Sequence, residues 1–265
     1  TLRLIAGFEE VTSGTIALSD RAIHTLAPAK RNVAMAFEGY SLYPPLTVRE
    51  NIAFALKSER LDKGEVTKRV QEIAHLLEIE DVLERYPSSI SGGQQQRASL
   101  GRALIRRAAL HLLAAPMGQL EPQLRALIRG RIKHFIKEHG LTAILVTHDQ
   151  TEANALADRI AVMEDGLLQQ FDTPDAIRER PANLFTGTFI GEPPMNVFDA
   201  KVKADGETVE FALGEDITLS YPHDKFADDL KQALHAAPDV TVGVRPHAVH
   251  IAEGGAPATV FANQR

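Results

Sequence analysis

The sequence predicts an α/β domain followed by a small, β-rich C-terminal domain. In the first 190 residues, short apolar runs of strand length alternate with longer segments whose apolar residues recur every three or four positions. Strands and helices that alternate in this way are typical of a mostly parallel sheet covered by helices. After residue 190 the pattern changes to short strands without long helices between most of them, which indicates a separate domain over residues 191–265.

The composition excludes several classes of function. The chain has 265 residues, a formal net charge of −6 and no cysteine, which excludes disulfides, thiolate metal sites and a cysteine nucleophile. The acidic balance argues against a nucleic-acid partner. No apolar run reaches the roughly 20 residues that span a bilayer, and nothing resembles a signal peptide. We therefore expect a cytoplasmic protein, and because the first residue is Thr1 we expect residues upstream of it.

The elements of the first domain are predicted from apolar periodicity and from turn residues. Apolar runs predict strands over residues 15–18, 33–37, 110–113 and 142–147, and a hairpin of residues 159–163 and 167–171. Helical spacing predicts helices over residues 2–6, 48–57, 62–77, 80–85, 98–107, 123–138, 150–157, 174–180 and 183–190.

The most informative stretch lies just before the predicted helix of residues 98–107. Ser91 and Gln94 form a capping box, and Gly92 and Gly93 between them let the backbone approach a ligand closely. A helix that begins in this way presents free N–H groups and a positive dipole end to an anion. A well-capped surface helix is the simpler interpretation of the serine and glutamine alone.

The full run Ile90-Ser91-Gly92-Gly93-Gln94 resembles the Leu-Ser-Gly-Gly-Gln signature motif of ABC-type ATPases. Other stretches match this family at fitting distances, above all Val-Thr-His-Asp-Gln at residues 146–150. Residues 1–14 resemble the stretch after the family's phosphate-binding loop, and the loop itself, Gly-x-x-Gly-x-Gly-Lys-Ser/Thr, is not present. The resemblance implies an ABC-type nucleotide-binding domain over residues 1–190, incomplete at its N-terminus, with a helical subdomain over about residues 48–107.

The resemblance also implies roles for individual residues. In this family the signature motif reaches across a dimer and holds the γ-phosphate of ATP bound to the partner subunit. Ser91, Gly92 and Gly93 would therefore bind a partner's nucleotide, with Gln94 supporting their loop. His148 matches the switch histidine that contacts the γ-phosphate of its own nucleotide, at the C-terminal end of a strand, where ligands bind in α/β sheets.

Besides Ile90 in the signature motif, four positions expected at the nucleotide site depart from the family pattern. Glu38 stands where a glutamine contacts Mg²⁺ and the attacking water; its carboxylate can ligate Mg²⁺, and a solvated loop glutamate is the alternative. Glu121 ends the D-loop, where the family commonly has aspartate; it keeps the carboxylate on a longer side chain, and the resemblance implies that it contributes to nucleotide binding. Ala114 and Ala115 replace the acidic pair that holds Mg²⁺ and polarises the attacking water. An alanine does neither, so we expect hydrolysis to be impaired.

Two further regions of the chain resemble parts of the same family. Tyr40, Leu42, Tyr43 and Pro44 resemble the apolar surface that receives a coupling helix from the membrane subunits. The phrase Gly-Val-Arg-Pro at residues 243–246 resembles the C-terminal regulatory domain of importer ATPases of the maltose and glycerol-phosphate type. We therefore expect residues 191–265 to form a small OB-like β-barrel, itself incomplete. Its predicted elements are strands over residues 197–202, 208–213, 217–221, 240–244 and 258–261 and a helix over residues 225–236.

Together these features imply the ATP-binding subunit of an ABC importer for sugars, polyols or glycerol phosphate, with ATP and Mg²⁺ as its cofactors. The expected partners are a second ATP-binding subunit, in a homodimer or heterodimer, two transmembrane permease subunits and, indirectly, a solute-binding protein. The expected location is the cytoplasmic face of the membrane. A non-enzymatic regulatory subunit that docks on the membrane subunits is the alternative. The acidic charge and the lack of long heptads argue against an ABC-type ATPase of chromosome or repair machinery.

Overall fold

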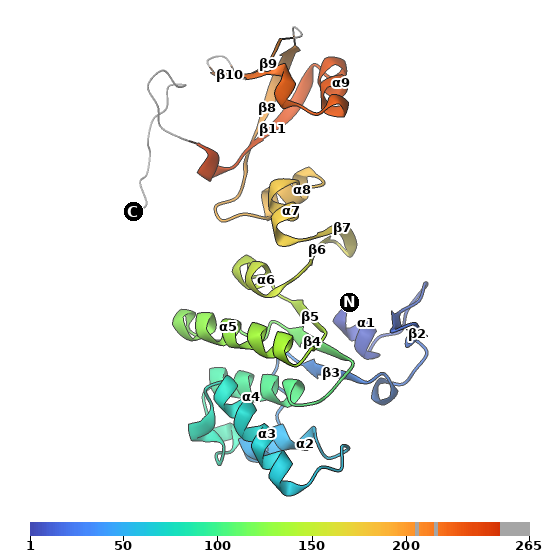
Figure 1. Cartoon of the computed structure of the whole chain (residues 1–265), viewed down its shortest axis with the longest axis vertical. Coiled ribbons are helices and arrows are strands. Elements are labelled where there is room, and N and C mark those ends of the chain that lie inside the picture. Colours follow the sequence, from blue (N-terminus) through green and yellow to red (C-terminus); the bar gives the residue numbers. More distant parts are fainter. Residues whose placement is uncertain (205–206, 215–216, 250–265) are drawn as a thin grey trace. The chain divides into compact units, whose positions relative to one another are not determined.

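The computed structural model describes residues 1–204, 207–214 and 217–249. The chain divides into two compact units, Thr1–Ala157 and Asp158–Arg265. The first unit contains a parallel sheet with helices on both faces, and the described part of the second contains a hairpin, three α-helices and an antiparallel sheet (Figure 1).

Most of the predicted elements of the first unit are present. Its helices are α1 (Leu2–Ala6), α2 (Val48–Phe54), α3 (Lys63–Leu76), α4 (Gly92–Leu104), α5 (Pro122–Glu138) and α6 (Gln150–Leu156). Its strands are β1 (Ala17–Leu18), β2 (Arg21–Ala22), β3 (Val33–Ala36), β4 (Leu110–Ala114) and β5 (Ala143–Val146).

The central sheet of the first unit has the order β3-β4-β5, and both pairs are parallel. Side chains alternate between its two faces. Leu110 and Leu112 pack against α1 on one face, while Leu113 belongs to the core formed with α4 and α5 on the other. The strand β4 is therefore covered on both sides, which explains why its sequence is a continuous apolar run.

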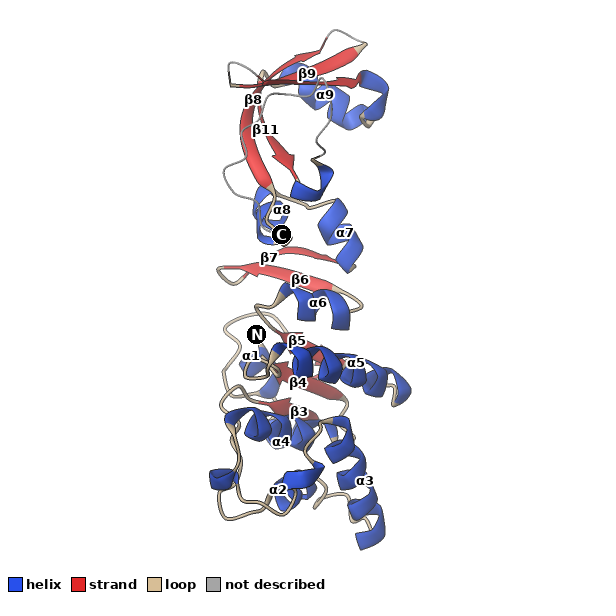
Figure 2. Ribbon diagram, turned by 90° about the vertical axis from the view of Figure 1, so that its left-hand side faces the viewer, coloured by secondary structure: helices blue, strands red, loops and turns tan. Residues whose placement is uncertain are grey.

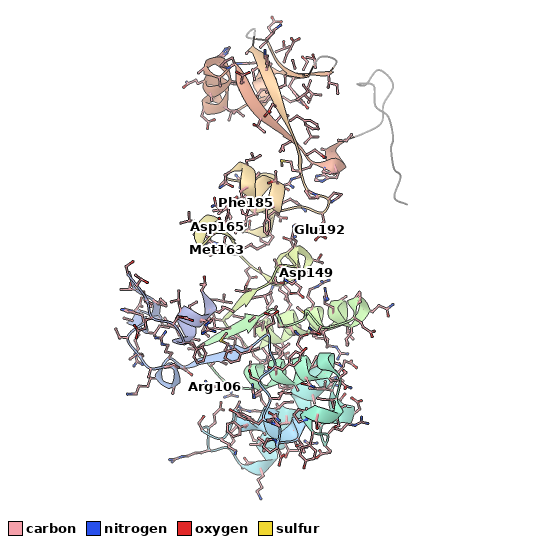
Figure 3. All side chains as sticks on the ribbon, turned by 180° about the vertical axis from the view of Figure 1, so that it is seen from behind. Arg106, Asp149, Met163, Asp165, Phe185 and Glu192 are labelled. Carbon is pink, nitrogen blue, oxygen red and sulfur yellow. The ribbon has the colours of Figure 1, made fainter. Side chains whose placement is uncertain are left out.

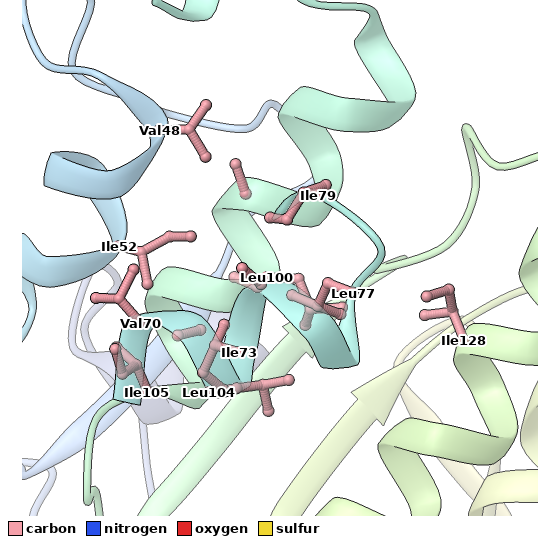
Figure 4. Close-up of a cluster of buried hydrophobic side chains, with 14 of the residues drawn as sticks. Val48, Ile52, Val70, Ile73, Leu77, Ile79, Leu100, Leu104, Ile105 and Ile128 are labelled. Carbon is pink, nitrogen blue, oxygen red and sulfur yellow. The ribbon is translucent and has the colours of Figure 1, made fainter. Parts of the chain in front are cut away.

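The largest core lies among α2, α3 and α4 (Figure 4). Ile52, Ile73 and Leu77 are at most 1% exposed and belong to the same buried cluster as Leu100 of α4. Each such side chain stabilises the fold by roughly 1.5–3 kcal/mol through its burial. This core holds α4, and with it the glycine-rich turn at its start, in a fixed position on the helical part of the unit.

Some predicted boundaries in the first unit are wrong. The helix predicted from residue 98 begins at Gly92, because the capping box pairs the N–H groups of Ser91 and Gln94 and so stabilises a first turn that contains two glycines. The helix predicted to reach residue 57 ends at Phe54, and residues 80–85 contain only the 3-10 turn Glu80–Val82. The strand predicted over residues 15–18 is limited to β1, which pairs with β2, a strand of two residues that was not predicted.

The second unit starts with the predicted hairpin and ends in an antiparallel sheet (Figure 2). Its elements are β6 (Ile160–Glu164), β7 (Leu167–Asp172), α7 (Pro174–Glu179), α8 (Leu184–Phe189), β8 (Asn196–Ala204), β9 (Thr208–Leu213), β10 (Ile217–Pro222), α9 (Asp228–Ala236) and β11 (Asp239–Val244). The second sheet has the order β10-β9-β8-β11, and Leu234 of α9 packs in its core with Phe211. Within the described ranges these strands form an open sheet, and the strand predicted over residues 258–261 lies outside them.

Arg245 connects the end of this sheet to the two helices that precede it. Its guanidinium donates hydrogen bonds of 2.7 and 3.1 Å to the carbonyl oxygen of Arg178 and of 2.7 Å to that of Ile190. A Cβ on Gly191, whose φ is +137°, would lie 2.7 Å from the same guanidinium. Glycine is therefore required where the chain passes this contact.

Candidate functional site

The glycine-rich turn has the predicted capping-box geometry. Ser91 Oγ accepts a hydrogen bond of 3.2 Å from the Gln94 N–H, and Gln94 Oε1 accepts one of 3.0 Å from the Ser91 N–H. Both bonds hold the first turn of α4 in the conformation that projects backbone N–H groups outward from the helix start. We call residues 91–93 the signature turn.

The two glycines of the signature turn lie against other loops. A Cβ built on Gly92 would be 3.3 Å from the Tyr40 hydroxyl oxygen, and one on Gly93 would be 3.2 Å from the carbonyl oxygen of Gln119. A larger residue at either position would push against these neighbours. The structure thus brings Tyr40, expected at a membrane-subunit surface, to the signature turn as well.

The loop after β3 is held by its neighbours rather than by regular structure. Tyr40 has a left-handed backbone with φ 59°, and its carbonyl oxygen accepts a 3.4 Å hydrogen bond from Arg102 of α4. The fully buried Asn51 accepts a 2.7 Å hydrogen bond from the Tyr43 N–H and donates one of 3.1 Å to the Tyr43 carbonyl. Asn51 was not predicted as a site residue, since an asparagine in an amphipathic helix carries no distinguishing signal.

An apolar groove of about 360 Å³ runs beside this loop. It is lined by Leu46, Glu50, Ala53, Phe54, Leu56, Lys57, Arg60, Leu61 and Val66. The rings of Tyr43 and Phe54 are 4.7 Å apart, and their residues are 43% and 36% exposed. Lys57 lies over the Phe54 ring at 4.4 Å, so a cation borders the exposed aromatic pair. Of the predicted membrane-subunit residues, Tyr43 and Pro44 are exposed and Leu42 is half-buried against the core.

Three predicted positions follow the carboxyl ends of adjacent parallel strands. Glu38 follows β3, Ala115 follows β4 and His148 follows β5, and the strand register places these ends at one edge of the sheet. Glu38 and His148 are exposed. This is the edge at which α/β sheets bind ligands.

The residues at the end of β4 are apolar and tightly bonded through their backbone. Ala115 donates its N–H to the Val146 carbonyl at 2.8 Å and accepts a 3.0 Å hydrogen bond from Gln96. Its φ is 42°, a left-handed conformation that costs an alanine about 1–2 kcal/mol. The methyl groups of Ala114 and Ala115 offer neither a metal ligand nor a proton acceptor.

The segment around His148 is ordered by a short polar network. Thr147 Oγ1 donates to Glu152 at 2.8 Å, and Asp149 caps α6 by accepting the Glu152 N–H at 3.0 Å. Figure 3 labels Asp149. Burial alone would raise the pKa of the Asp149 carboxyl, but hydrogen bonds from the backbone of Glu152 and Thr151 and from Arg125 outweigh it, so this pKa lies below its ordinary value.

Arg125 also joins the His148 segment to the loop that contains Glu121. Its guanidinium donates 3.1 Å hydrogen bonds to Asp149 Oδ2 and to the carbonyl of Leu120. Glu121 itself is exposed at the start of α5 and accepts the Arg125 N–H through its backbone carbonyl at 2.8 Å. The structure therefore links the loops after β4 and β5 through one arginine.

Comparisons with known proteins identify the family. The family model described as ABC transporter matches residues 1–117, and the model described as MalK OB fold domain matches residues 191–249. The sn-glycerol-3-phosphate import ATP-binding protein UgpC of Cereibacter sphaeroides is 41% identical over 251 residues, which are 95% of this chain and 67% of UgpC. This chain belongs to the ABC transporter family.

Further comparisons agree with this assignment to the ABC family. The trehalose import ATP-binding protein SugC of Mycobacterium tuberculosis is 41% identical over 249 residues, which are 93% of this chain and 61% of SugC, so the chain spans 61% of that relative's length. The solved dimer of the ATP-binding cassette MJ0796, in a post-hydrolysis state bound to ADP and Pi, has 26% identity and a TM-score of 0.60 over 65% of this chain and 78% of its own. These findings confirm the ABC-type fold and the OB-type C-terminal domain.

Proposed function

We propose that this chain is an ATP-binding subunit of an ABC importer for a sugar, polyol or glycerol phosphate. The import roles printed in the names of UgpC and SugC support this proposal. The signature turn is the observation that carries it, because its capping box presents free N–H groups at the start of a helix. In the proposed function this turn binds the γ-phosphate of ATP held by a second ATP-binding subunit.

Hydrolysis at this chain's own site is impaired in the proposal. Ala114 and Ala115 occupy the end of β4, where the family has its acidic pair. A positioned general base contributes about 10²–10⁴ to a rate. Mg²⁺ at nucleotide sites is commonly held by one or two carboxylates together with substrate phosphates. At the ends of β3 and β4 this chain offers the carboxylate of Glu38 and the methyl groups of Ala114 and Ala115. Among the residues that the structure describes, no group of three His, Cys, Asp or Glu side chains is placed to hold a metal ion.

The proposed partners are the second ATP-binding subunit and two transmembrane permease subunits, with a solute-binding protein acting through the permeases. The groove beside Tyr43 and Phe54 is the proposed contact for the permeases, because it combines an apolar lining with exposed aromatic rings. The proposed location is the cytoplasmic face of the membrane. None of the helices in the described part of the chain has the length and apolar character needed to cross a bilayer.

The same groove favours one alternative: a non-enzymatic regulatory subunit that docks on the permeases. The two proposals differ in their need for nucleotide. Binding to permeases in lipid nanodiscs with equal affinity in the presence and absence of ATP would support the alternative. Binding that is strengthened by ATP in the presence of a second ATP-binding subunit would support the importer subunit.

The central experiment mixes this chain with an importer ATP-binding subunit that has an intact phosphate loop and acidic pair but a disabled signature motif. We expect the chain to restore ATP turnover at that subunit's site. Gly92→Asp should abolish the rescue, because an acidic residue in the first turn favours the helix but repels phosphate. Gly130→Asp is the matched control, since it adds the same carboxylate at a position of α5 where a Cβ meets nothing within 4 Å.

The outcomes of this experiment are distinct. Lack of rescue by the unmodified chain would contradict the proposed role of the signature turn. The chain alone should show no Mg-ATP turnover above background, and turnover at ordinary importer rates with contaminants excluded would contradict the proposed impairment.

A further inference from the structure

Gln96 makes two hydrogen bonds between α4 and the loop after β4. Its side-chain nitrogen donates to the Ala115 carbonyl at 3.0 Å, and its side-chain oxygen accepts the Gln119 N–H at 2.9 Å. The residue is 3% exposed. Both polar atoms of a buried amide are thus paired with backbone groups 19 and 23 positions away.

The neighbours of Gln96 on α4 bond in a different direction. Gln95 donates to the carbonyls of Pro87 and Ile90, and Arg97 donates to those of Leu77 and Glu78. These contacts anchor the helix to the preceding helical segments. Gln96 instead bonds to the loop that leaves the parallel sheet, so the first turns of α4 are held on both sides.

The same loop also touches the signature turn. The Gln119 carbonyl would lie 3.2 Å from a Cβ on Gly93, three residues before Gln96. Three residues of helix rise by roughly 4.5 Å, so the signature turn and the amide of Gln96 are close together on one rigid helical segment. The two hydrogen bonds of Gln96 therefore tie the loop after β4 to the helical segment that begins with the signature turn.

We propose that Gln96 is a positioning residue that couples the signature turn to the loop of residues 115–119. This inference rests on the proposed function, in which the turn binds a partner's ATP. The position of the signature turn against that ATP then depends on the loop at the end of β4, because the two hydrogen bonds of Gln96 join the loop to α4. Gln96 itself touches no nucleotide in this proposal.

The first test measures the hydrogen bond itself. Gln96→Met keeps a side chain of similar length but removes both bonds, whereas Gln95→Met on the same helix removes an amide that does not reach the loop. We expect amide hydrogen exchange at Gln119 to accelerate at least tenfold in Gln96→Met and to stay unchanged in Gln95→Met. Equal exchange at Gln119 in both variants would overturn the proposed link.

The second test measures coupling in the mixed assay, with ATP as the probe. We expect Gln96→Met to raise the ATP concentration for half-maximal turnover about tenfold, and Gln95→Met to stay within twofold of the unmodified chain. If exchange at Gln119 accelerates but the ATP dependence is unchanged, Gln96 is only structural and the inference is wrong. If the unmodified chain does not restore ATP turnover, the result contradicts the proposed function, and the proposed coupling, which rests on it, is contradicted as well.

A third variant covers the case in which Gln96→Met does not fold. Gln96→Glu keeps an acceptor for the Gln119 N–H but cannot donate to the Ala115 carbonyl when ionised. We expect Gln119 to remain protected from exchange while the ATP dependence shifts. An unchanged ATP dependence in this variant would also contradict the inference.

Discussion

Replacement of Gly101 by alanine tests how closely α4 is packed on α3. A Cβ on Gly101 would lie 2.8 Å from Ile73 Cγ2 and 3.1 Å from Leu77 Cδ1. Ordinary contacts start at about 3.4 Å, and both neighbours are at most 1% exposed, so neither can move into solvent. Figure 4 shows Ile73 and Leu77 within the core formed with α4.

The expected magnitude follows from two opposing contributions. Alanine is favoured over glycine inside a helix by about 1 kcal/mol. Overpacking of a well-filled core costs about 1–3 kcal/mol. Gly101→Ala should therefore be neutral or destabilising by up to about 2 kcal/mol, whereas Gly130→Ala, on the exposed side of α5, should stabilise by about 1 kcal/mol.

Urea unfolding followed by far-ultraviolet circular dichroism measures this difference. We expect the free energy of unfolding to be about 1–3 kcal/mol lower in Gly101→Ala than in Gly130→Ala. The two variants share the same chemical change and the same helical setting, so propensity cancels between them. Equal unfolding free energies would show that α3 and α4 can separate without cost, and the reasoning would be refuted.

Three other predictions concern buried polar and strained residues. Burial lowers the pKa of the His111 imidazole in the folded chain, so the unfolded chain takes up a proton more readily. The free energy of unfolding should therefore fall as the pH drops below about 6.5, the ordinary pKa of histidine. The urea midpoints at pH 7.5 and pH 5.5 should differ less in His111→Leu than in the unmodified chain. Arg97→Met leaves the carbonyls of Leu77 and Glu78 without their charged donor. It should lower the free energy of unfolding by about 2–4 kcal/mol in the same assay. The same substitution at an exposed arginine should leave the free energy of unfolding unchanged. Ala115→Gly relieves the left-handed backbone and should raise the free energy of unfolding by about 0.5–1 kcal/mol; a decrease would contradict the inferred strain.

The sequence was most informative where chemistry is local. The capping box of α4 was predicted because Ser91 and Gln94 stand three positions apart, and it is present with the expected bonds. The hairpin of β6 and β7 was predicted from the turn residues between two apolar runs. In each case the residues that interact are neighbours in the chain, so their pattern is sufficient.

The contacts that build the candidate site could not be predicted in this way. Gln96 and Asn51 are ordinary amides in amphipathic helices, and their partners are mostly backbone groups. Backbone groups carry no sequence signal, and those bonded to Gln96 lie on a loop that only the tertiary fold brings near. The approach of Tyr40 to Gly92 was missed for the same reason.

The contact of Arg245 bears on how this protein can be divided for study. The match to the MalK OB fold model covers residues 191–249, and it includes Arg245 but not Arg178 or Ile190. A fragment cut at that limit would keep the guanidinium and discard the carbonyl oxygens of Arg178 and Ile190 with which it bonds. The hairpin, its two helices and the last sheet are thus better expressed as a single polypeptide than as the sheet alone.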